Sequence, residues 1–431
     1  MLSRVIRNRS LVILGFAESV SGLGSWITGL AVFSLIIFRG DGNVVQSSGI
    51  LLASLLPMLL FSPVAGSLID RFDRRRLMVA SELLAGVTVA GLIFVQNIWL
   101  IYLLLALQSI FNTIMMPARQ AVVPDLVERE NLTSANAFLQ QLAGLIKVAA
   151  PILAGALLAL VNPHTAIIFD VISYALSAII LTRLPALPPH PKAPAADATA
   201  EPSLATSGDF KNLLRAAPHL RLIFLSTFLA TAAIIGFDVL SAIFTRDILQ
   251  GNEATFGLLI GLIGLGTVAG AAGLMLSKRK RNLWTDVVAG LLLLTVLAAA
   301  VAIGAWVGNP AVATAVMAAG CLLAGLGMGI MHVQIATLIQ LLTPAALLGR
   351  AGGMFQSVAV AGQITGILLT PLLVPGWLSV AQFFGLATLA LLALVVYIVA
   401  TVRKSPPVTE PVAAASNAAQ EPAADSALSP L

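Results

Sequence analysis

Twelve long runs of apolar residues, almost free of charge, constrain this chain more than any other feature. They cover residues 11–37, 46–69, 77–96, 98–118, 134–160 and 164–184, and then 220–249, 255–277, 283–306, 311–341, 348–374 and 376–402. A helix that crosses a bilayer needs about 20 apolar residues. Backbone groups in lipid must be paired within the structure, and continuous runs favour helices over the alternating strands of a barrel. The runs predict an all-α membrane protein with twelve transmembrane helices.

The composition agrees with burial in lipid. Only 10% of residues are charged and 58% are hydrophobic, with a mean hydropathy of +0.98, whereas soluble domains are about 25% charged. The net charge of +5 is spread over short connections, so we expect no nucleic-acid partner. The single cysteine, Cys321, excludes an intramolecular disulfide.

Lysine and arginine gather on alternate connections between the runs. One set of connections holds Arg4, Arg7, Arg9, Arg71, Arg74, Arg75, Arg76, Arg129, Arg183, Lys192, Lys211, Arg215, Arg221, Lys278, Arg279, Lys280, Arg281, Arg350, Arg403 and Lys404. The other set holds only Arg39 and Arg246. Because basic residues stay in the cytoplasm, both termini are predicted to be cytoplasmic, in a bacterial inner membrane. The first run is too long for a signal peptide and is interpreted as a retained helix.

A proline- and alanine-rich stretch divides the chain into two halves. We expect a six-helix half at 1–184, a flexible cytoplasmic linker at 185–219, a second half at 220–402 and a disordered cytoplasmic tail at 403–431. The fifth and eleventh runs share a short pattern in which Gln140 and Gln356 lie 216 residues apart. This offset is about half the chain, which indicates two six-helix pseudo-repeats.

The connection after the second run carries the most specific motif. Its sequence, G-S-L-I-D-R-F-D-R-R-R from Gly66 to Arg76, resembles the signature loop of the major facilitator superfamily, G-x-L-x-D-R-x-G-R-[RK]. Asp73 stands where the family usually has glycine, so a left-handed backbone is expected at a residue that merely tolerates it. The other interpretation is a basic loop that only sets orientation.

The resemblance implies a cytoplasmic gate. Its residues are Gly66, Asp70, Arg71, Arg74, Arg119 and Asp125. Asp70 is expected to cap the start of the eleventh helix, Arg74 to pair with Asp125, and Arg119 to pair with Asp70 or contact substrate. This latch would hold the outward-open state, although static pairing without a switching role is an equal alternative.

The fourth and fifth runs are similar to the drug:proton antiporter branch of that superfamily, which includes macrolide and siderophore exporters. The similar segments are Pro117–Val127, Ala135–Ala137 and Ala150–Gly155. The branch usually has G-P-x-x-G-G in the fifth helix, and this chain replaces two glycines with Ala150 and Ala154. Pro151, Gly155, Gly362 and Gly366 are the expected helix-packing residues.

Four ionisable residues lie at membrane depth, where they normally face a cavity or a partner. Glu18 and Asp238 are the candidate proton-coupling residues because they are deep and come from opposite halves. Lys147 is a candidate for binding an anionic substrate group or neutralising an acid, and Asp170 is a counter-ion candidate. A permanent structural ion pair is the alternative for each acid. Glu18 shares a small-residue face with Gly15, Ser19 and Gly22, which suits a cavity wall.

A largely apolar cavity is expected to hold the substrate. The residues proposed to line it are Trp26, Phe33, Phe111, Met115, Phe237, Phe355 and Gln356. Aromatic residues at helical spacing also occur in cores and against lipid, which is the alternative interpretation.

No sequence feature indicates an enzyme. There is no nucleotide-binding G-x-x-x-x-G-K-[ST] loop and no His/Cys cluster with metal spacing, so no cofactor or metal is expected. The predicted function is export of a small amphipathic molecule by a proton-coupled monomer, with protons and membrane lipid as further partners. The alternatives are a lysophospholipid or siderophore transporter of the same fold, and a receptor or scaffold that transports nothing.

Overall fold

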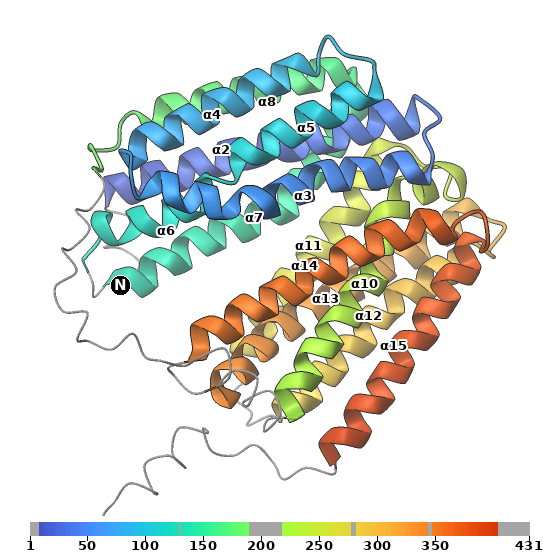
Figure 1. The fold of residues 1–431 in the computed structure, drawn as a ribbon. Coiled ribbons are helices and arrows are strands. Elements are labelled where there is room, and N and C mark those ends of the chain that lie inside the picture. The colour runs from blue at the N-terminus through green and yellow to red at the C-terminus, as the bar shows by residue number, and fades with distance from the viewer. Residues whose placement is uncertain (1–7, 129–130, 189–217, 277–281, 344–346, 404–431) are drawn as a thin grey trace, which may run out of the picture.

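The computed structural model describes residues 8–128, 131–188, 218–276, 282–343 and 347–403, which form helices and no strand (Figure 1). The first half contains α2 (Arg9–Phe33) with its π-helical continuation η1 (Ser34–Phe38), α3 (Val44–Ile69), α4 (Arg74–Gly91), α5 (Ile98–Asn112), α6 (Met115–Leu126), α7 (Leu132–Leu160) and α8 (Pro163–Leu181). The second half contains α10 (Pro218–Asp247), α11 (Glu253–Leu276), α12 (Leu283–Gly304), α13 (Pro310–Leu342), α14 (Leu348–Leu373) and α15 (Val380–Arg403).

The predicted twelve spans are confirmed in the described part of the chain. Eleven segments are long and apolar enough to cross a membrane. α4 is the twelfth, and its three N-terminal arginines and Glu82 fall within a helix of only 18 residues, so its charge density is high. The fourth span consists of α5 and α6 and reaches Leu126, beyond the predicted end at residue 118, because its polar final turns still pack against α3, α4 and α7.

The helices form two groups that lie one above the other in Figure 1. In the first half α8 packs against α2 and α4, α7 against α2, and α5 against α3 and α4. In the second half α13 packs against α11 and α12, α15 against α12, and α10 against α14. The main contacts between the halves are α7 with α11 and α3 with α14.

The two ends of the bundle differ. We call them the Arg39 end, which holds the connections at 39–43 and 248–252, and the Arg74 end, which holds the connection at 70–73. One continuous apolar core covers the second half and the Arg39 end of the first half. A separate apolar cluster fills the first half at the Arg74 end, with members that include Leu11, Met78 and Leu181. Among the described residues, the halves therefore share a core at the Arg39 end.

Most helices begin with a cap from their own flanking residue. Asparagine side chains accept backbone N–H groups of the first turn at Asn8, Asn43, Asn97, Asn162, Asn252, Asn282 and Asn309. Asp73 does the same for α4. The first N–H groups of a helix lack partners within the helix, and Asn and Asp are among the residues that best supply one.

The predicted linker and tail fall mainly outside the described residues. Of 185–219, the structure describes 185–188 and 218–219, and of 403–431 only Arg403. Leu187 is buried and its N–H donates to Asp73 Oδ2 at 2.9 Å. Residues as far as Leu187 therefore pack with the first half.

Candidate functional site

Two polar stripes meet inside the first half. On α8 the stripe consists of Asp170, Ser173, Tyr174 and Ser177, all buried. On α2 it consists of Glu18, Ser21, Ser25 and Thr28. These spacings place each set on one helix face, and α2 and α8 pack directly against each other. Buried polar groups cost free energy unless they are hydrogen-bonded, so the partners of each group in these stripes decide its state.

Glu82 of α4 lies against these stripes and is only 3% exposed. Ser21 Oγ donates to its Oε1 at 3.2 Å, and Ser177 lies beside it. The carboxylates of Asp170 and Glu18 are within electrostatic range of Glu82. The structure thus gathers three acids from α2, α4 and α8.

Asp170 is fully buried. Ser173 Oγ donates to its Oδ1 at 2.9 Å, and Thr28 lies next to the carboxylate. Gly24 allows the backbone of α2 to approach α8 closely, since a Cβ at that position would overlap both Asp170 and Ser173. The backbone of α2 therefore lies directly against the carboxylate.

Tyr174, on the same face of α8 as Asp170, is the centre of a hydrogen-bond network. Its hydroxyl accepts from Gln108 Nε2 at 3.1 Å and from Asn112 Nδ2 at 2.9 Å. Ser25 Oγ lies 3.0 Å from the same hydroxyl. These bonds tie α5 to α2 and α8 through polar side chains.

Glu18 pairs with Arg119 of α6, with Nη1 and Oε2 3.4 Å apart. The expectation that Arg119 pairs with Asp70 is wrong, because α6 places the guanidinium against α2. The small-residue face of α2 also differs from the expectation of a cavity wall. Gly15 and Gly22 pack against side chains of α7, including Leu142 and Ile146.

The other two ionisable candidates lie apart from this cluster. Asp238 of α10 is partly buried, and no described side chain donates to its carboxylate, while its backbone carbonyl accepts from Ser241 Oγ at 3.1 Å. Lys147 of α7 is exposed and lies within electrostatic range of His332 of α13. The structure therefore does not bring Lys147 to Asp170 or Glu18, and it places a histidine of the other half near it instead.

The apolar candidates fall into two groups. Phe33 is buried and stacks on Phe256 of α11 with ring centroids 5.7 Å apart, and Phe237 is also buried. These two belong to the packed core at the Arg39 end of the halves. Trp26, Phe111, Met115 and Phe355 are partly buried, and Gln356 is exposed. A role of these residues in substrate binding stays a prediction.

The Gly66–Arg76 loop docks on its own half. Arg74, which is buried, donates from Nη1 to Asp125 Oδ2 and to the carbonyl of Ala121. Asp73 caps α4 with φ −58° and ψ 120°, so the expected left-handed backbone at this residue is wrong. The residue that replaces the family glycine serves as a helix cap.

Asp70 and its neighbours make no hydrogen bond to the described residues of the second half. Asp70 and Arg71 are exposed, and no hydrogen bond joins Asp70 to a described residue of α14. A Cβ added at Gly66 would meet nothing within 4 Å. Capping of α14 by Asp70 therefore stays a prediction for another conformation, in which the halves meet at the Arg74 end.

Polar side chains join the halves at the Arg39 end. Glu253, the first residue of α11, accepts from Ser34 Oγ at 2.6 Å and pairs with Arg39 Nε at 3.2 Å. Ser47 of α3 donates to the carbonyl of Val239 in α10. From the sequence, Arg39 is predicted only as one of two basic residues on the sparsely charged side of the membrane; the structure adds a contact between the halves.

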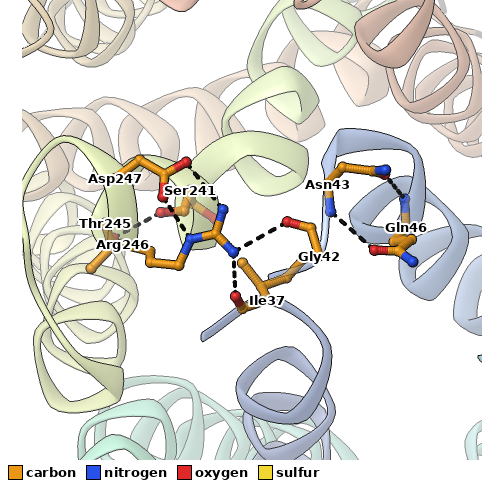
Figure 2. A network of polar contacts seen from close by, with 8 residues as sticks. All are labelled: Ile37, Gly42, Asn43, Gln46, Ser241, Thr245, Arg246 and Asp247. Carbon is orange, nitrogen blue, oxygen red and sulfur yellow. Dashed lines mark hydrogen bonds and ion pairs between the residues drawn. The ribbon is translucent and has the colours of Figure 1, made fainter. Parts of the chain in front are cut away.

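Arg246 crosses in the opposite direction, from α10 to the connection after η1 (Figure 2). Its Nη1 donates to the carbonyls of Ile37 and Gly42, the latter at 3.3 Å. Asp247 holds the guanidinium from the other side, at 2.6 Å from Nε. Among side chains that the structure describes, the hydrogen bonds and ion pairs between the halves all lie at this end.

The predicted packing residues lie at close helix contacts. A Cβ on Gly155 of α7 would meet backbone atoms of Glu253 and Gly257 in α11. The carbonyl of Pro151 lies against Gly257. Gly362 and Gly366 of α14 pack against α10 in the same way. Gly155 is therefore part of the contact between the halves.

The sequence predicts Asp170 as a candidate, but the interpretation misses Glu82 and the other members of the α8 stripe, Ser173, Tyr174 and Ser177. The stripe is visible as D-x-x-S-Y-x-x-S from Asp170 to Ser177, a helical polar repeat inside an apolar run. Glu82 lay so close to the three arginines of its helix that it was not distinguished from an interfacial charge. Asp286 of α12, in the other half, is also a buried acid, and its carboxylate accepts from Gln334 Nε2 at 2.7 Å.

These features define a class of protein, a polytopic helical membrane protein whose two six-helix groups meet at one end. Residues 14–364 match the family model of the Major Facilitator Superfamily. The chain belongs to this superfamily and is a membrane transporter of that type, which confirms the resemblance drawn from the Gly66–Arg76 loop.

Known relatives match most of the chain or a part of it. The chain is 26% identical over 366 residues to the uncharacterised MFS-type transporter YfiS of Bacillus subtilis, covering 83% of this chain and 85% of that protein. It is 28% identical over 177 residues to Macrolide efflux protein A of Streptococcus pyogenes, covering 39% and 44%. It is 26% identical over 179 residues to the multidrug efflux pump Tap of Mycobacterium tuberculosis, covering 39% and 42%. The matches span less than half of the two efflux proteins.

Solved structures show the same fold. A crystal structure of the peptide transporter POT aligns with a TM-score of 0.71 and 15% identity, over 91% of this chain and 94% of that one. A bacterial homologue of ferroportin in an inward-facing state aligns with a TM-score of 0.69 and 17% identity, over 91% and 98%. At such identities the likeness concerns the fold alone.

Proposed function

We propose that this transporter exports a small amphipathic molecule of the macrolide or siderophore type by proton-coupled alternating access. One observation carries the proposal: the polar contacts between described side chains of the two halves are confined to the Arg39 end. Exchange of these few bonds for contacts at the Arg74 end would move access from one side to the other. Similarity to Macrolide efflux protein A and Tap supports the substrate class.

The proposed setting is the bacterial inner membrane, with both termini and the Arg74 end in the cytoplasm. The distribution of lysine and arginine supports this orientation. The moving bodies are the halves at 1–184 and 220–402, joined by the linker at 185–219. The transporter works as a monomer and needs no metal or cofactor.

Glu18 and Asp238 are the proposed coupling residues. Each lies within a membrane-spanning helix, where an ionised carboxylate needs a partner or water. Glu18 has Arg119 as its partner in this conformation, whereas Asp238 has no described donor. A proton that binds when the surroundings are dry and leaves when they are wet would link the proton gradient to the movement of the halves.

Transport by purified protein in liposomes tests this function. With an imposed proton gradient, a macrolide should move against its own concentration gradient. Glu18→Gln and Asp238→Asn should each lower gradient-driven transport at least about tenfold, equal to roughly 1.4 kcal/mol. Both should retain exchange of substrate for substrate, because that reaction needs no net proton movement.

Glu128→Gln is the matched control, since Glu128 is exposed at the Arg74 end. It should transport like the parent protein. Macrolide movement that ignores the gradient would exclude antiport, and normal coupling in both variants would exclude the two sites. Movement of a labelled lysophospholipid instead of a macrolide would favour the lipid transporter, and no flux of either would favour a receptor.

A further inference from the structure

The three acids of the first half exceed the positive charge available to them. Arg119 already pairs with Glu18 at 3.4 Å. Most other charged groups on the neighbouring helices lie at the two ends of the bundle. At the Arg74 end, Arg74 pairs with Asp125, Arg75 bonds the carbonyl of Leu184, and Arg9 and Arg76 are exposed; at the Arg39 end, His164 lies in the first turn of α8. The remaining titratable groups are Tyr174 of α8, Tyr102 of α5, which bonds the carbonyl of Gln46, and Lys147 of α7, which is exposed near His332. Glu82 and Asp170 thus have no cation of their own among the described side chains.

Both carboxyl groups are buried away from water, and only one of the two oxygens in each group has a hydrogen-bond partner. Glu82 is 3% exposed and Asp170 0%. One oxygen of each accepts a serine hydroxyl, while Glu82 Oε2 and Asp170 Oδ2 have no hydrogen-bond partner. Two ionised carboxylates in one dry site repel each other and lack solvation, so one of them normally holds a proton.

Two further hydroxyl groups lie beside the acids. Ser177 Oγ beside Glu82 and Thr28 Oγ1 beside Asp170 are buried and unpaired. A carboxylic acid offers an O–H donor that a carboxylate lacks. As donors these hydroxyls can bond either form of the acids, and with a proton present the O–H of the acid can in turn donate to one of them.

We propose that Glu82 and Asp170 form a proton-binding dyad between α2, α4 and α8. A proton from water adds to one carboxylate oxygen, forming an O–H bond and leaving a neutral acid; on release that bond breaks and the proton returns to water. Loss of the proton leaves two charges in the dry site, that of Asp170 against the backbone of α2 at Gly24 and that of Glu82 at Ser21, so that α2 is pushed from α4 and α8 or the site takes in water. The presence of the proton is independent of the proposed export, and only its use in coupling rests on that function.

Infrared difference spectroscopy of the purified protein at neutral pH tests the dyad. The spectrum of the parent minus Glu82→Gln/Asp170→Asn should contain the C=O band of a protonated carboxylic acid, which shifts in deuterated water. Glu82→Gln and Asp170→Asn alone provide the same test if the double variant does not fold. A difference spectrum with carboxylate bands only would overturn the proposal.

Glu253→Gln is the matched control. Glu253 is also buried, but it is paired with Arg39 and bonded to Ser34. Its difference spectrum should show carboxylate bands and no acid band. A macrolide added to the parent should change the intensity of the dyad's acid band if the proton is used in transport. An acid band in a protein that transports nothing would keep the dyad and refute the export function.

Discussion

Arg119 forms a largely buried ion pair with Glu18, so its substitution should affect the stability of the protein. Its guanidinium comes from α6 and reaches the carboxylate of Glu18 on α2, with the two side chains 13% and 19% exposed. Removing one member of such a pair leaves a charge with poor solvation, whereas removing both leaves none. The two substitutions should therefore not be additive.

Arg119→Gln should lower the free energy of unfolding by about 3 kcal/mol. Glu18→Gln/Arg119→Gln should recover at least half of that loss, because no buried charge remains. Thermal unfolding of detergent-purified variants measures both. Arg76→Gln, at an exposed arginine of the Arg74 end, should leave the unfolding temperature unchanged. Additive losses in the double variant would contradict the pairing.

At the scale of helices, the contact between α2 and α8 depends on a glycine. Gly24 lies where a methyl group would overlap Asp170 and Ser173, both buried. Gly29 lies on the same helix but faces open space, since a Cβ there would meet nothing within 4 Å. Both glycines are in the helical backbone of α2, but only Gly24 is packed against another helix.

Gly24→Ala should destabilise the protein by about 2 kcal/mol, because overpacking forces the helices apart. Gly29→Ala should be neutral or stabilise by up to about 1 kcal/mol, since alanine favours the helix. Thermal unfolding of the two variants side by side separates packing from helix propensity. Equal stabilities would show that α2 and α8 are not in direct contact at Gly24.

The helices were predictable and their facing sides were not. Long apolar runs dictate helices in lipid whatever their neighbours, so the spans and the loop at Gly66–Arg76 could be predicted from sequence. The face that a helix turns to its neighbour depends on tertiary packing. α2 carries both a glycine face at Gly15 and Gly22 and a polar face at Ser21 and Ser25, and the sequence does not show which one meets α7.

The same limit applies to the site. Glu18 could be found because a lone acid in an apolar run is conspicuous. Its partner Arg119 could be named as a functional arginine, but not assigned to Glu18, because the two residues are 101 positions apart. Glu82 is hard to distinguish from the neighbouring arginines in the sequence, and only the fold shows that it lies within electrostatic range of Asp170.

At the scale of the whole molecule, the halves are joined by bonds that cross in both directions at the Arg39 end. Arg39 reaches from the first half to Glu253, and Arg246 reaches from the second half to Ile37 and Gly42. Hydrogen bonds to a charged group contribute about 1.5–3 kcal/mol each. Loss of Arg246 should therefore shift the population toward opening at this end.

Ser47→Cys supplies a reporter of that opening. Ser47 is fully buried at the contact with α10, and the natural Cys321 is also buried, so background labelling is low. In detergent solution, Arg246→Gln should raise the rate at which a thiol reagent modifies the introduced cysteine about tenfold, corresponding to 1.4 kcal/mol. Arg76→Gln should leave the rate unchanged. An unchanged rate in Arg246→Gln would show that this arginine does not hold the halves together.

The asparagine caps at the helix starts have a consequence for such motion. Each cap bonds the first turn of the helix that it precedes, as at Asn43, where the side chain accepts from Gln46 (Figure 2). Because these bonds stay within one short segment, they travel with the helix when its neighbours change. The first turns keep their hydrogen bonds in every arrangement of the two halves. The helices therefore move as rigid bodies. The free-energy difference between arrangements then comes from the contacts between helices that change.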